Sequence, residues 1–197
     1  MQAKAPPGGP LILASGSRYR ADLLRRLGIP FEQKSSDADE TPRRGEAAAA
    51  LAQRLAMAKA EAVAKRLPGR WILGSDQVIS AGGRLLGKPG SIERAREQLA
   101  MLSGRSVQFV TAVALLADGK ARTALDTTTV RFRALSAEEI TRYVAAEPAL
   151  DCAGSFKCEG LGITLCEAIE TRDPTALIGL PLIATRELLA AAGYALP

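Results

Sequence analysis

A nearly apolar run, Trp71-Ile72-Leu73-Gly74-Ser75-Asp76-Gln77-Val78-Ile79, carries three polar residues near its centre. Short apolar runs of this kind are typical of strands that are buried on both faces of a sheet in α/β proteins. An aspartate in such a strand is costly unless it is paired or bound to a metal. We therefore favour a functional Asp76 at a strand end that faces a ligand crevice. The structural alternatives are a hydrogen-bond network, or a strand that ends at Gly74.

Helix and strand candidates alternate on both sides of this run, which predicts an α/β fold with a mixed sheet. Strands are expected at 11–14, 31–34, 71–79, 84–86, 107–117, 128–133 and up to 169, and helices at 18–27, 46–67, 91–102, 136–146 and 181–192. Asp118-Gly119 is a strong hairpin signal between two of the strands. Internal repeats and linkers are absent from the sequence, so we expect one domain over residues 11–197 after a flexible tail at 1–10.

The composition excludes several kinds of chemistry. The chain has 197 residues, 47% hydrophobic and 24% charged, which is typical of a globular domain. It contains no histidine, so Ser-His-Asp triads, Cys-His dyads and His-ligated zinc are excluded. Proton transfer falls to Asp, Glu, Lys, Tyr or Cys, and a metal would need oxygen or thiolate ligands.

Charge and apolar patterning give weaker indications about partners and location. The formal net charge of +5 favours an anionic partner only weakly. Four Phe, three Tyr and one Trp, with no basic run between them, argue against a dedicated nucleic-acid binder. No apolar run approaches the roughly 18 residues of a membrane span. The three cysteines fit neither a disulfide framework nor a metal pair, and we expect a cytoplasmic protein.

Lys59 lies on the apolar face of the long helix expected at 46–67. On a helical wheel the apolar residues of this helix fall on one arc of about 140°, with Lys59 near its middle. One interpretation is that the lysine stem lies along apolar surface and its ammonium reaches water. The other is that the arc borders a cleft into which Lys59 points. The wheel alone leaves both open.

Three further segments are candidates for phosphate or metal binding. Ser15-Gly16-Ser17-Arg18-Tyr19-Arg20 follows a strand and opens a helix, so its N–H, hydroxyl and guanidinium groups could hold a phosphate. A helix cap with solvated arginines is the competing interpretation. Asp37, Asp39 and Glu40 form either a solvated acidic loop or a source of oxygen ligands for Mg²⁺. Lys88, in a turn, is a candidate phosphate contact.

In this order the motifs resemble the Maf family of nucleoside triphosphate pyrophosphatases over the whole chain from Leu11. The matching stretches are Leu13-Ala14-Ser15-Gly16-Ser17 with Arg20, Asp39-Glu40-Thr41-Pro42, Ala58-Lys59-Ala60, Gly74-Ser75-Asp76-Gln77-Val78, Gly87-Lys88-Pro89, Ser103-Gly104, Gly154-Ser155-Phe156-Lys157-Cys158-Glu159-Gly160 and Gly179-Leu180-Pro181-Leu182. The resemblance implies an elongated, two-lobed α/β domain with a mixed sheet and a central cleft, similar to the inosine-triphosphate pyrophosphatases. It implies cleavage of a nucleoside triphosphate between its α and β phosphates, with a divalent metal.

The resemblance also implies roles for individual residues. Asp76 would be the proton acceptor that activates water, and Lys59 and Lys88 would assist catalysis. The phosphate-binding residues would be Ser15, Ser17, Arg20, Lys59 and Lys88. Glu40 and Asp76 would hold the metal, which we expect to be Mg²⁺, Mn²⁺ or Co²⁺.

Four positions resemble the branch of the family that hydrolyses 7-methyl-GTP. Gln77, Lys157 and Glu159 differ from the branch acting on dTTP and UTP, which has threonine and glutamine at positions 77 and 159. The Glu159 carboxylate could accept both N–H donors of the guanine edge. Tyr19 stands where the branch carries an aromatic residue, usually tryptophan, that would face the charged methylated ring.

The alternatives are a preference for UTP or dTTP, and a non-enzymatic module that binds nucleic acid or regulates septum formation. The oligomeric state stays open, with a homodimer as one alternative.

Overall fold

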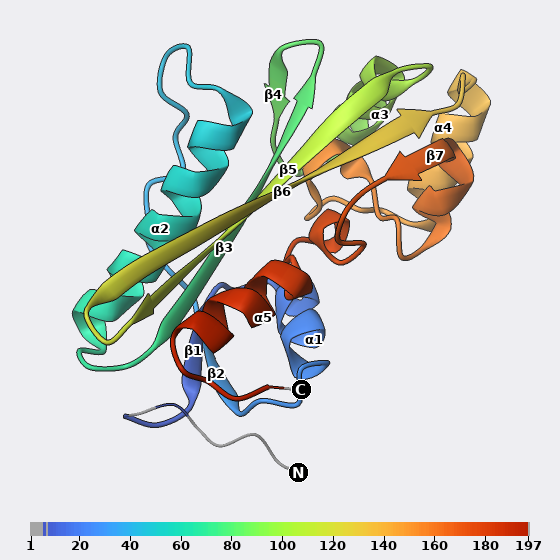
Figure 1. Ribbon diagram of the computed structural model, residues 1–197. Helices are drawn as coiled ribbons and strands as arrows, with labels where there is room; N and C mark the ends of the chain where they lie inside the picture. Colours follow the sequence, from blue (N-terminus) through green and yellow to red (C-terminus); the bar gives the residue numbers. More distant parts are fainter. Residues whose placement is uncertain (1–5, 7, 197) are drawn as a thin grey trace. The chain divides into compact units, whose positions relative to one another are not determined.

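A computed structural model describes residues 6 and 8–196 of the chain. The elements in chain order are β1 (Leu11–Ala14), α1 (Arg18–Arg25), β2 (Phe31–Lys34), α2 (Ala48–Arg66), β3 (Ile72–Ala81), β4 (Arg84–Leu86), α3 (Ile92–Leu102), β5 (Ser106–Ala117), β6 (Lys120–Phe132), α4 (Ala137–Ala146), β7 (Cys166–Glu170) and α5 (Leu182–Ala191) (Figure 1). Three short 3₁₀ helices, η1 (Ala153–Ser155), η2 (Leu161–Leu165) and η3 (Ala176–Ile178), were not predicted. The predicted alternation of helices and strands is confirmed.

The strands form one mixed sheet. Within the described residues it has seven strands in the order β2-β1-β3-β5-β6-β7, and β4 pairs with β3. The strand β1 is parallel to β2 and β3, whereas the β3–β4 and β6–β7 pairs are antiparallel. Asp118 and Gly119 join β5 to β6 with φ values of 51° and 71°, as a tight two-residue hairpin turn requires. The mixed α/β sheet and the hairpin are confirmed.

The chain divides into two compact units. Unit 1 contains the described residues up to Asp76, Thr111–Asp126 and those from Asp173 on, and unit 2 contains Gln77–Val110 and Thr127–Arg172. The strands β3, β5 and β6 each contribute residues to both units. A single two-lobed domain over 11–197 stays a prediction, and most of the tail expected at 1–10 lies outside the described residues.

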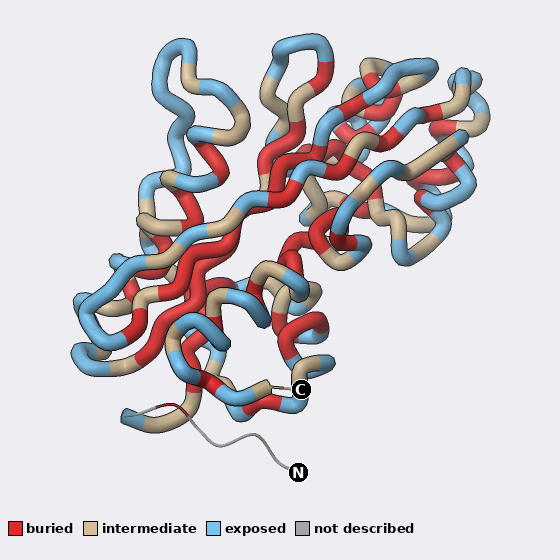
Figure 2. Tube along the Cα trace, viewed as in Figure 1, coloured by how far each residue is buried: buried red, intermediate tan, exposed pale blue. Residues whose placement is uncertain are grey.

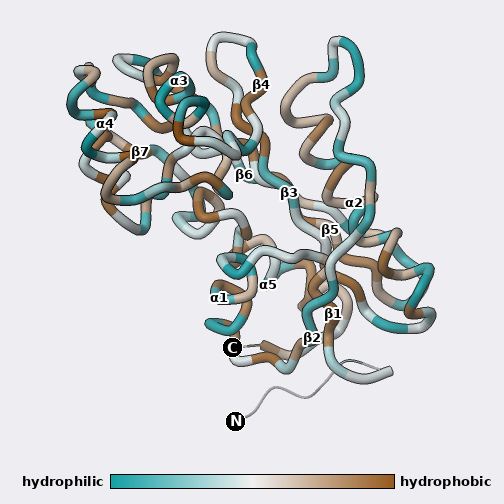
Figure 3. The backbone as a smooth tube through the Cα atoms, turned by 180° about the vertical axis from the view of Figure 1, so that it is seen from behind, coloured by the Kyte–Doolittle hydropathy of each residue, from teal (hydrophilic) through white to brown (hydrophobic). Residues whose placement is uncertain are grey.

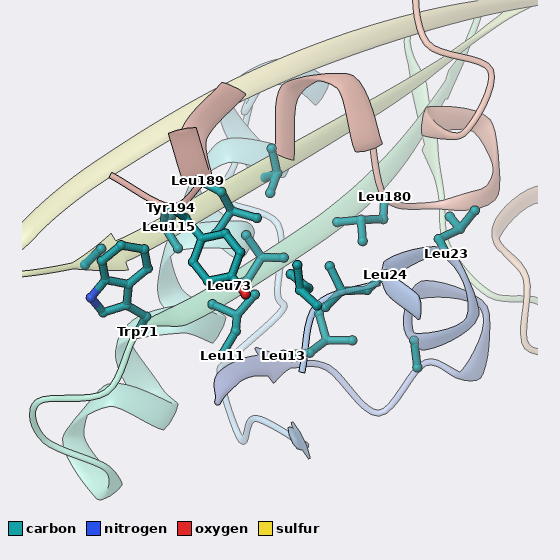
Figure 4. Close-up of a cluster of buried hydrophobic side chains, with 14 residues drawn as sticks. Leu11, Leu13, Leu23, Leu24, Trp71, Leu73, Leu115, Leu180, Leu189 and Tyr194 are labelled. Atoms are coloured by element: carbon teal, nitrogen blue, oxygen red, sulfur yellow. The ribbon is translucent and has the colours of Figure 1, made fainter. Parts of the chain in front are cut away.

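In unit 1, helices cover both faces of the strands. Successive strand residues point to opposite faces, and both faces of β1 and β3 carry apolar side chains. One face is shown in Figure 4, where residues of β1 and β3 pack with α1 and α5; its members include Leu11, Leu13, Leu23, Leu24, Leu73 and Leu189. On the other face α2 packs against the same strands, through Ile12, Ala14, Ile72, Ala60 and Val63. All of these side chains except Leu23, at 1%, are fully buried, and Figure 2 shows the strand interiors in red.

Unit 2 has its own aromatic core. Phe156 packs against Phe109 and Phe132 with ring centroids 5.6 and 5.1 Å apart. The side chain of Gln98 on α3 donates to Gly87 O and accepts a hydrogen bond from Ser155 Oγ, which ties η1 to α3. Across the described part of the chain, no helix is both long enough and apolar enough to cross a membrane.

Candidate active site

A buried ion pair joins α2 to β3. Ile72, Gly74 and Asp76 alternate along β3 and therefore share one face, the face on which α2 packs. The Lys59 ammonium donates to Asp76 Oδ1 at 2.6 Å, and the two residues are only 7% and 5% exposed. The expected functional Asp76 in a buried strand thus has a cationic partner, and the interpretation of Lys59 as a side chain that reaches water is wrong.

Glu40 joins this pair from the loop that precedes α2. Its Oε1 lies 2.8 Å from Lys59 Nζ, although 61% of its side chain remains exposed. A single ammonium therefore bridges two carboxylates that are far apart in sequence. Of the three acidic residues singled out in this loop, Asp39 instead accepts a hydrogen bond from the Thr41 backbone N–H.

The segment between β1 and α1 supplies hydroxyl and guanidinium groups. Ser17 caps α1 by accepting a hydrogen bond from the Arg20 backbone N–H. Arg20 Nη1 donates to Ser15 Oγ at 3.3 Å, and its Nε donates to Gly179 O at 2.8 Å. Both the capping and the phosphate interpretations of this segment are compatible with these contacts.

Arg20 is electrostatically coupled to the two carboxylates. Burial lowers the pKa of its guanidinium, while the negative charges of Asp76 and Glu40 oppose that shift. Arginine remains charged in proteins even when its pKa falls. Unit 1 therefore brings together three of the predicted phosphate-binding residues, Ser15, Arg20 and Lys59, and both predicted metal ligands.

The base-recognition residues are distributed over both units. In unit 1, Tyr19 contacts Arg18, whose guanidinium lies 4.8 Å from the ring centroid and donates to the phenolic oxygen. In unit 2, Gln77 is half-buried on β3 and Glu159 is exposed after η1. Lys157 lies 3.3 Å from the carboxylate of Glu147. Lys88, also in unit 2, is exposed after β4. The roles of these residues stay predictions.

Some residues around the site were missed by the sequence reasoning. Gly179 O accepts from Arg20 and lies 3.0 Å from Ser75 Oγ, so it links α1 to β3 through a backbone atom. Glu46, in the same loop as Glu40, pairs with Arg54 of α2. A backbone carbonyl leaves no pattern in the sequence, and a charged pair eight residues apart is not distinguishable there from solvated surface charges.

The carboxylates fit a magnesium-type ion that is shared with a substrate. The described residues contain no group of three or more acidic or cysteine side chains placed to hold a metal. Mg²⁺ usually binds through one or two carboxylates together with substrate phosphates and water. The two carboxylates of Glu40 and Asp76, gathered around one cation, match that donor set.

Comparison with known proteins identifies relatives over nearly the whole chain. A family model described as Maf-like protein matches residues 10–192. The chain is 58% identical to the 7-methyl-GTP pyrophosphatase of Xanthomonas oryzae pv. oryzae (strain MAFF 311018) over 187 residues. The aligned residues cover 95% of this chain and 98% of the relative. The chain is 54% identical to the protein of the same name from Bordetella pertussis (91% and 90% covered) and 51% identical to that of Polaromonas sp. strain JS666 (98% and 90% covered).

Proposed function

Because the chain belongs to the Maf family, we propose that it is a nucleoside triphosphate pyrophosphatase. It would cleave the bond between the α and β phosphates and release a monophosphate and pyrophosphate. The observation that carries this proposal is the Lys59 ammonium within 2.8 Å of both Glu40 and Asp76, with Arg20 coupled to the same carboxylates. Cations and carboxylates in this combination suit a metal-bound polyphosphate.

The chemistry assigned to the chain uses Asp76 as base and the cations as phosphate ligands. Asp76 accepts a proton from the water that attacks the phosphorus atom, the role that histidine has in many hydrolases. Lys59, Arg20 and Ser15 bind phosphate oxygens and stabilise the charge that develops there. Ser17 and Lys88 are assigned to the same phosphates through the family resemblance.

A divalent cation completes the proposed site. Glu40 and Asp76 would hold Mg²⁺, Mn²⁺ or Co²⁺. When bound, the cation supplies positive charge that polarises phosphate oxygens.

The proposed substrate is 7-methyl-GTP. Its support is the name of the relatives, 7-methyl-GTP pyrophosphatase, at 51–58% identity, together with the residues Gln77, Lys157, Glu159 and Tyr19. A cytoplasmic location, where such nucleotides are found, belongs to the same proposal. A homodimer stays a prediction.

A substrate panel tests the proposal. Pyrophosphate release is measured for 7-methyl-GTP, GTP, UTP and dTTP with each of the three metals, and we expect the highest kcat/KM for 7-methyl-GTP.

Asp76→Asn should reduce kcat by roughly 10²- to 10⁴-fold, the usual contribution of a general base. Asp22→Asn, the same change at an exposed position of α1, is the matched control. An Asp76→Asn enzyme that retains more than about a tenth of kcat would remove Asp76 from the role of base.

A second comparison tests the base preference. Glu159→Gln replaces one acceptor oxygen with a donor, so it should weaken 7-methyl-GTP hydrolysis more than UTP hydrolysis. Equal losses for both substrates would show that Glu159 does not read the guanine edge.

A further inference from the structure

The loop that carries Glu40 is not held in place by apolar packing. Residues 35–47 connect β2 to α2 without forming a helix or strand, and all of them are exposed or half-buried (Figure 2). Figure 3 shows the hydrophilic character of the loop tip. A hollow of about 740 Å³ is lined by side chains of both this loop and α2, most of them polar or charged. Polar contacts must therefore fix the position of the loop.

Three side chains of α2 bind the loop at successive points. Arg66 Nη2 donates to Ser35 O at 2.7 Å, at the beginning of the loop. Lys59 contacts Glu40 in the middle. Arg54 Nη2 donates to Thr41 O at 3.1 Å, one residue beyond Glu40. These three contacts attach the loop to α2 at its beginning and at its middle.

Arg54 also organises the end of the loop through Glu46. Its Nε and Nη2 donate to the two carboxylate oxygens of Glu46, both at 2.7 Å. Glu46 Oε2 also accepts a hydrogen bond from the Arg43 backbone N–H at 2.9 Å. A two-point contact between a planar guanidinium and a carboxylate fixes orientation as well as distance. The Arg54 side chain therefore contacts both ends of the segment from Thr41 to Glu46.

We propose that Arg54 and Glu46 are positioning residues that hold Glu40 in place for the divalent cation. The proposal rests on the proposed function. The Lys59 contact uses Oε1 of Glu40, so this contact would be lost if Glu40 turned that oxygen to a metal. The Arg54 contact to Thr41 is the remaining attachment adjacent to Glu40 in the chain.

The pKa of Glu46 is determined mainly by its contacts with Arg54 and Arg43. The hydrogen bonds from Arg54, aided by the Arg43 N–H, lower the pKa of Glu46 to about 2. The pair therefore stays charged throughout the neutral range in which nucleotides are hydrolysed.

The test compares Arg54→Ala, Arg54→Lys and Glu46→Gln with Arg44→Ala. The control removes the same charge from an exposed residue of the loop. Binding of Mn²⁺ is measured by electron paramagnetic resonance, with a 7-methyl-GTP analogue that has a methylene bridge between its α and β phosphates. Amide hydrogen exchange of residues 36–46 is measured on the same proteins, and the Mn²⁺ dependence of kcat is followed with 7-methyl-GTP.

We expect Arg54→Ala to weaken Mn²⁺ binding roughly 10- to 100-fold, the usual effect of losing a residue that supports a metal ligand. Exchange at residues 41–46 should accelerate, and Arg54→Lys, which cannot make the two-point contact, should fall between Arg54→Ala and the wild type. Saturating Mn²⁺ should restore most of kcat. The Arg54→Ala/Glu46→Gln double variant should lose little more than the worse single variant, because both break the same contact.

Wild-type Mn²⁺ binding and wild-type exchange in Arg54→Ala would overturn the proposal. If Arg54→Ala does not fold, Arg54→Lys and Glu46→Gln give the decision by the same measurements. A wild-type protein that releases no pyrophosphate from any triphosphate would refute the proposed function, whereas the binding and exchange measurements would still decide the role of Arg54.

Discussion

Lys59 and Asp76 stabilise each other inside unit 1. Each is less than 8% exposed, and their charged atoms are 2.6 Å apart. Removal of one member of a buried ion pair leaves the other charge without compensation, which is more damaging than replacing both. Lys59 is therefore a structural residue as well as a candidate phosphate ligand.

Lys59→Met should destabilise the protein by about 3–5 kcal/mol, because Asp76 would be left buried without its ion-pair partner. Adding Asp76→Asn should recover much of that loss. Lys65→Met, the same change at an exposed position of α2, should stay within about 0.5 kcal/mol of wild type. Urea unfolding of the four proteins measures these differences, and a fully stable Lys59→Met would show that the pair adds nothing to stability.

The individual residues of this pair could be predicted from the sequence, but their contact could not. Asp76 interrupts an apolar strand and Lys59 interrupts an apolar helix face, and both signals are local. The contact spans 17 positions in sequence and depends on how closely α2 lies against β3. For Glu40 the local signal was only a cluster of acidic residues, and the family resemblance singled it out.

At the scale of elements, Gly74 determines the spacing between α2 and β3. A Cβ at this position would lie 2.2 Å from Ala56 O and 3.0 Å from Ala60 N, both in the backbone of α2. Backbone atoms cannot move aside as the end of a flexible side chain can. The close approach allowed by glycine therefore brings Lys59 within reach of Asp76.

Gly74→Ala should lower stability by about 1–3 kcal/mol, as overpacking of a core usually does. It should also reduce pyrophosphate release, because the added methyl group would push α2, and with it Lys59, away from Asp76. Gly87→Ala is the control for stability, since a Cβ there would meet no atom within 4 Å. Thermal unfolding and activity are measured together; a stable, fully active Gly74→Ala would contradict this account of the spacing.

The Arg54–Glu46 pair predicts a pH dependence of stability. The pKa of Glu46 is about 2 in the folded protein, lowered mainly by the Arg54 hydrogen bonds, against an ordinary value of 4.5. The stabilisation from the charged pair is therefore fully present above about pH 4.5 and is lost as the pH falls toward 2. Glu46→Gln should be less stable than wild type at pH 6, and the difference should shrink between pH 4.5 and pH 2. A constant difference across that range would contradict the lowered pKa.

Most elements could be predicted because their signals are periodic or local. The helix at Ile92–Leu102 and the strand at Phe31–Lys34 occur as expected, and β3 extends two residues beyond its predicted end. The 3₁₀ helices η1 and η2 were missed because single turns carry no hydrophobic repeat. In η1, Gly154 and Ser155 both have positive φ, a conformation that non-glycine residues rarely adopt.

At the scale of the whole molecule, three strands run through both units, so the units are continuous in backbone. The single tryptophan, Trp71, is buried in unit 1 and donates to Asp118. All three cysteines, Cys152, Cys158 and Cys166, belong to unit 2 and form no disulfide. Each unit therefore carries its own natural probe of folding.

Unfolding in urea should give coincident midpoints for tryptophan fluorescence and for thiol labelling, because neither unit can lose β3, β5 or β6 alone. Burial raises the pKa of Cys158 to about 12 and that of Cys166 to about 11. Since the thiolate is the reactive form, both should react slowly at pH 8 until the protein unfolds. Two separated midpoints would show that the units unfold independently.

The position of Lys59 between Glu40 and Asp76 has a kinetic consequence for the proposed reaction. The ammonium takes the place of a counter-ion for both carboxylates, so a free divalent cation would compete with it unaided. A triphosphate would offer its own oxygens to Lys59, and Glu40 and Asp76 would then hold the metal that it chelates. On the proposed mechanism the metal–nucleotide complex would enter as one species, and a metal added alone would bind weakly. In an enzyme of this kind, product departure would return the lysine to its carboxylates and reset the resting state.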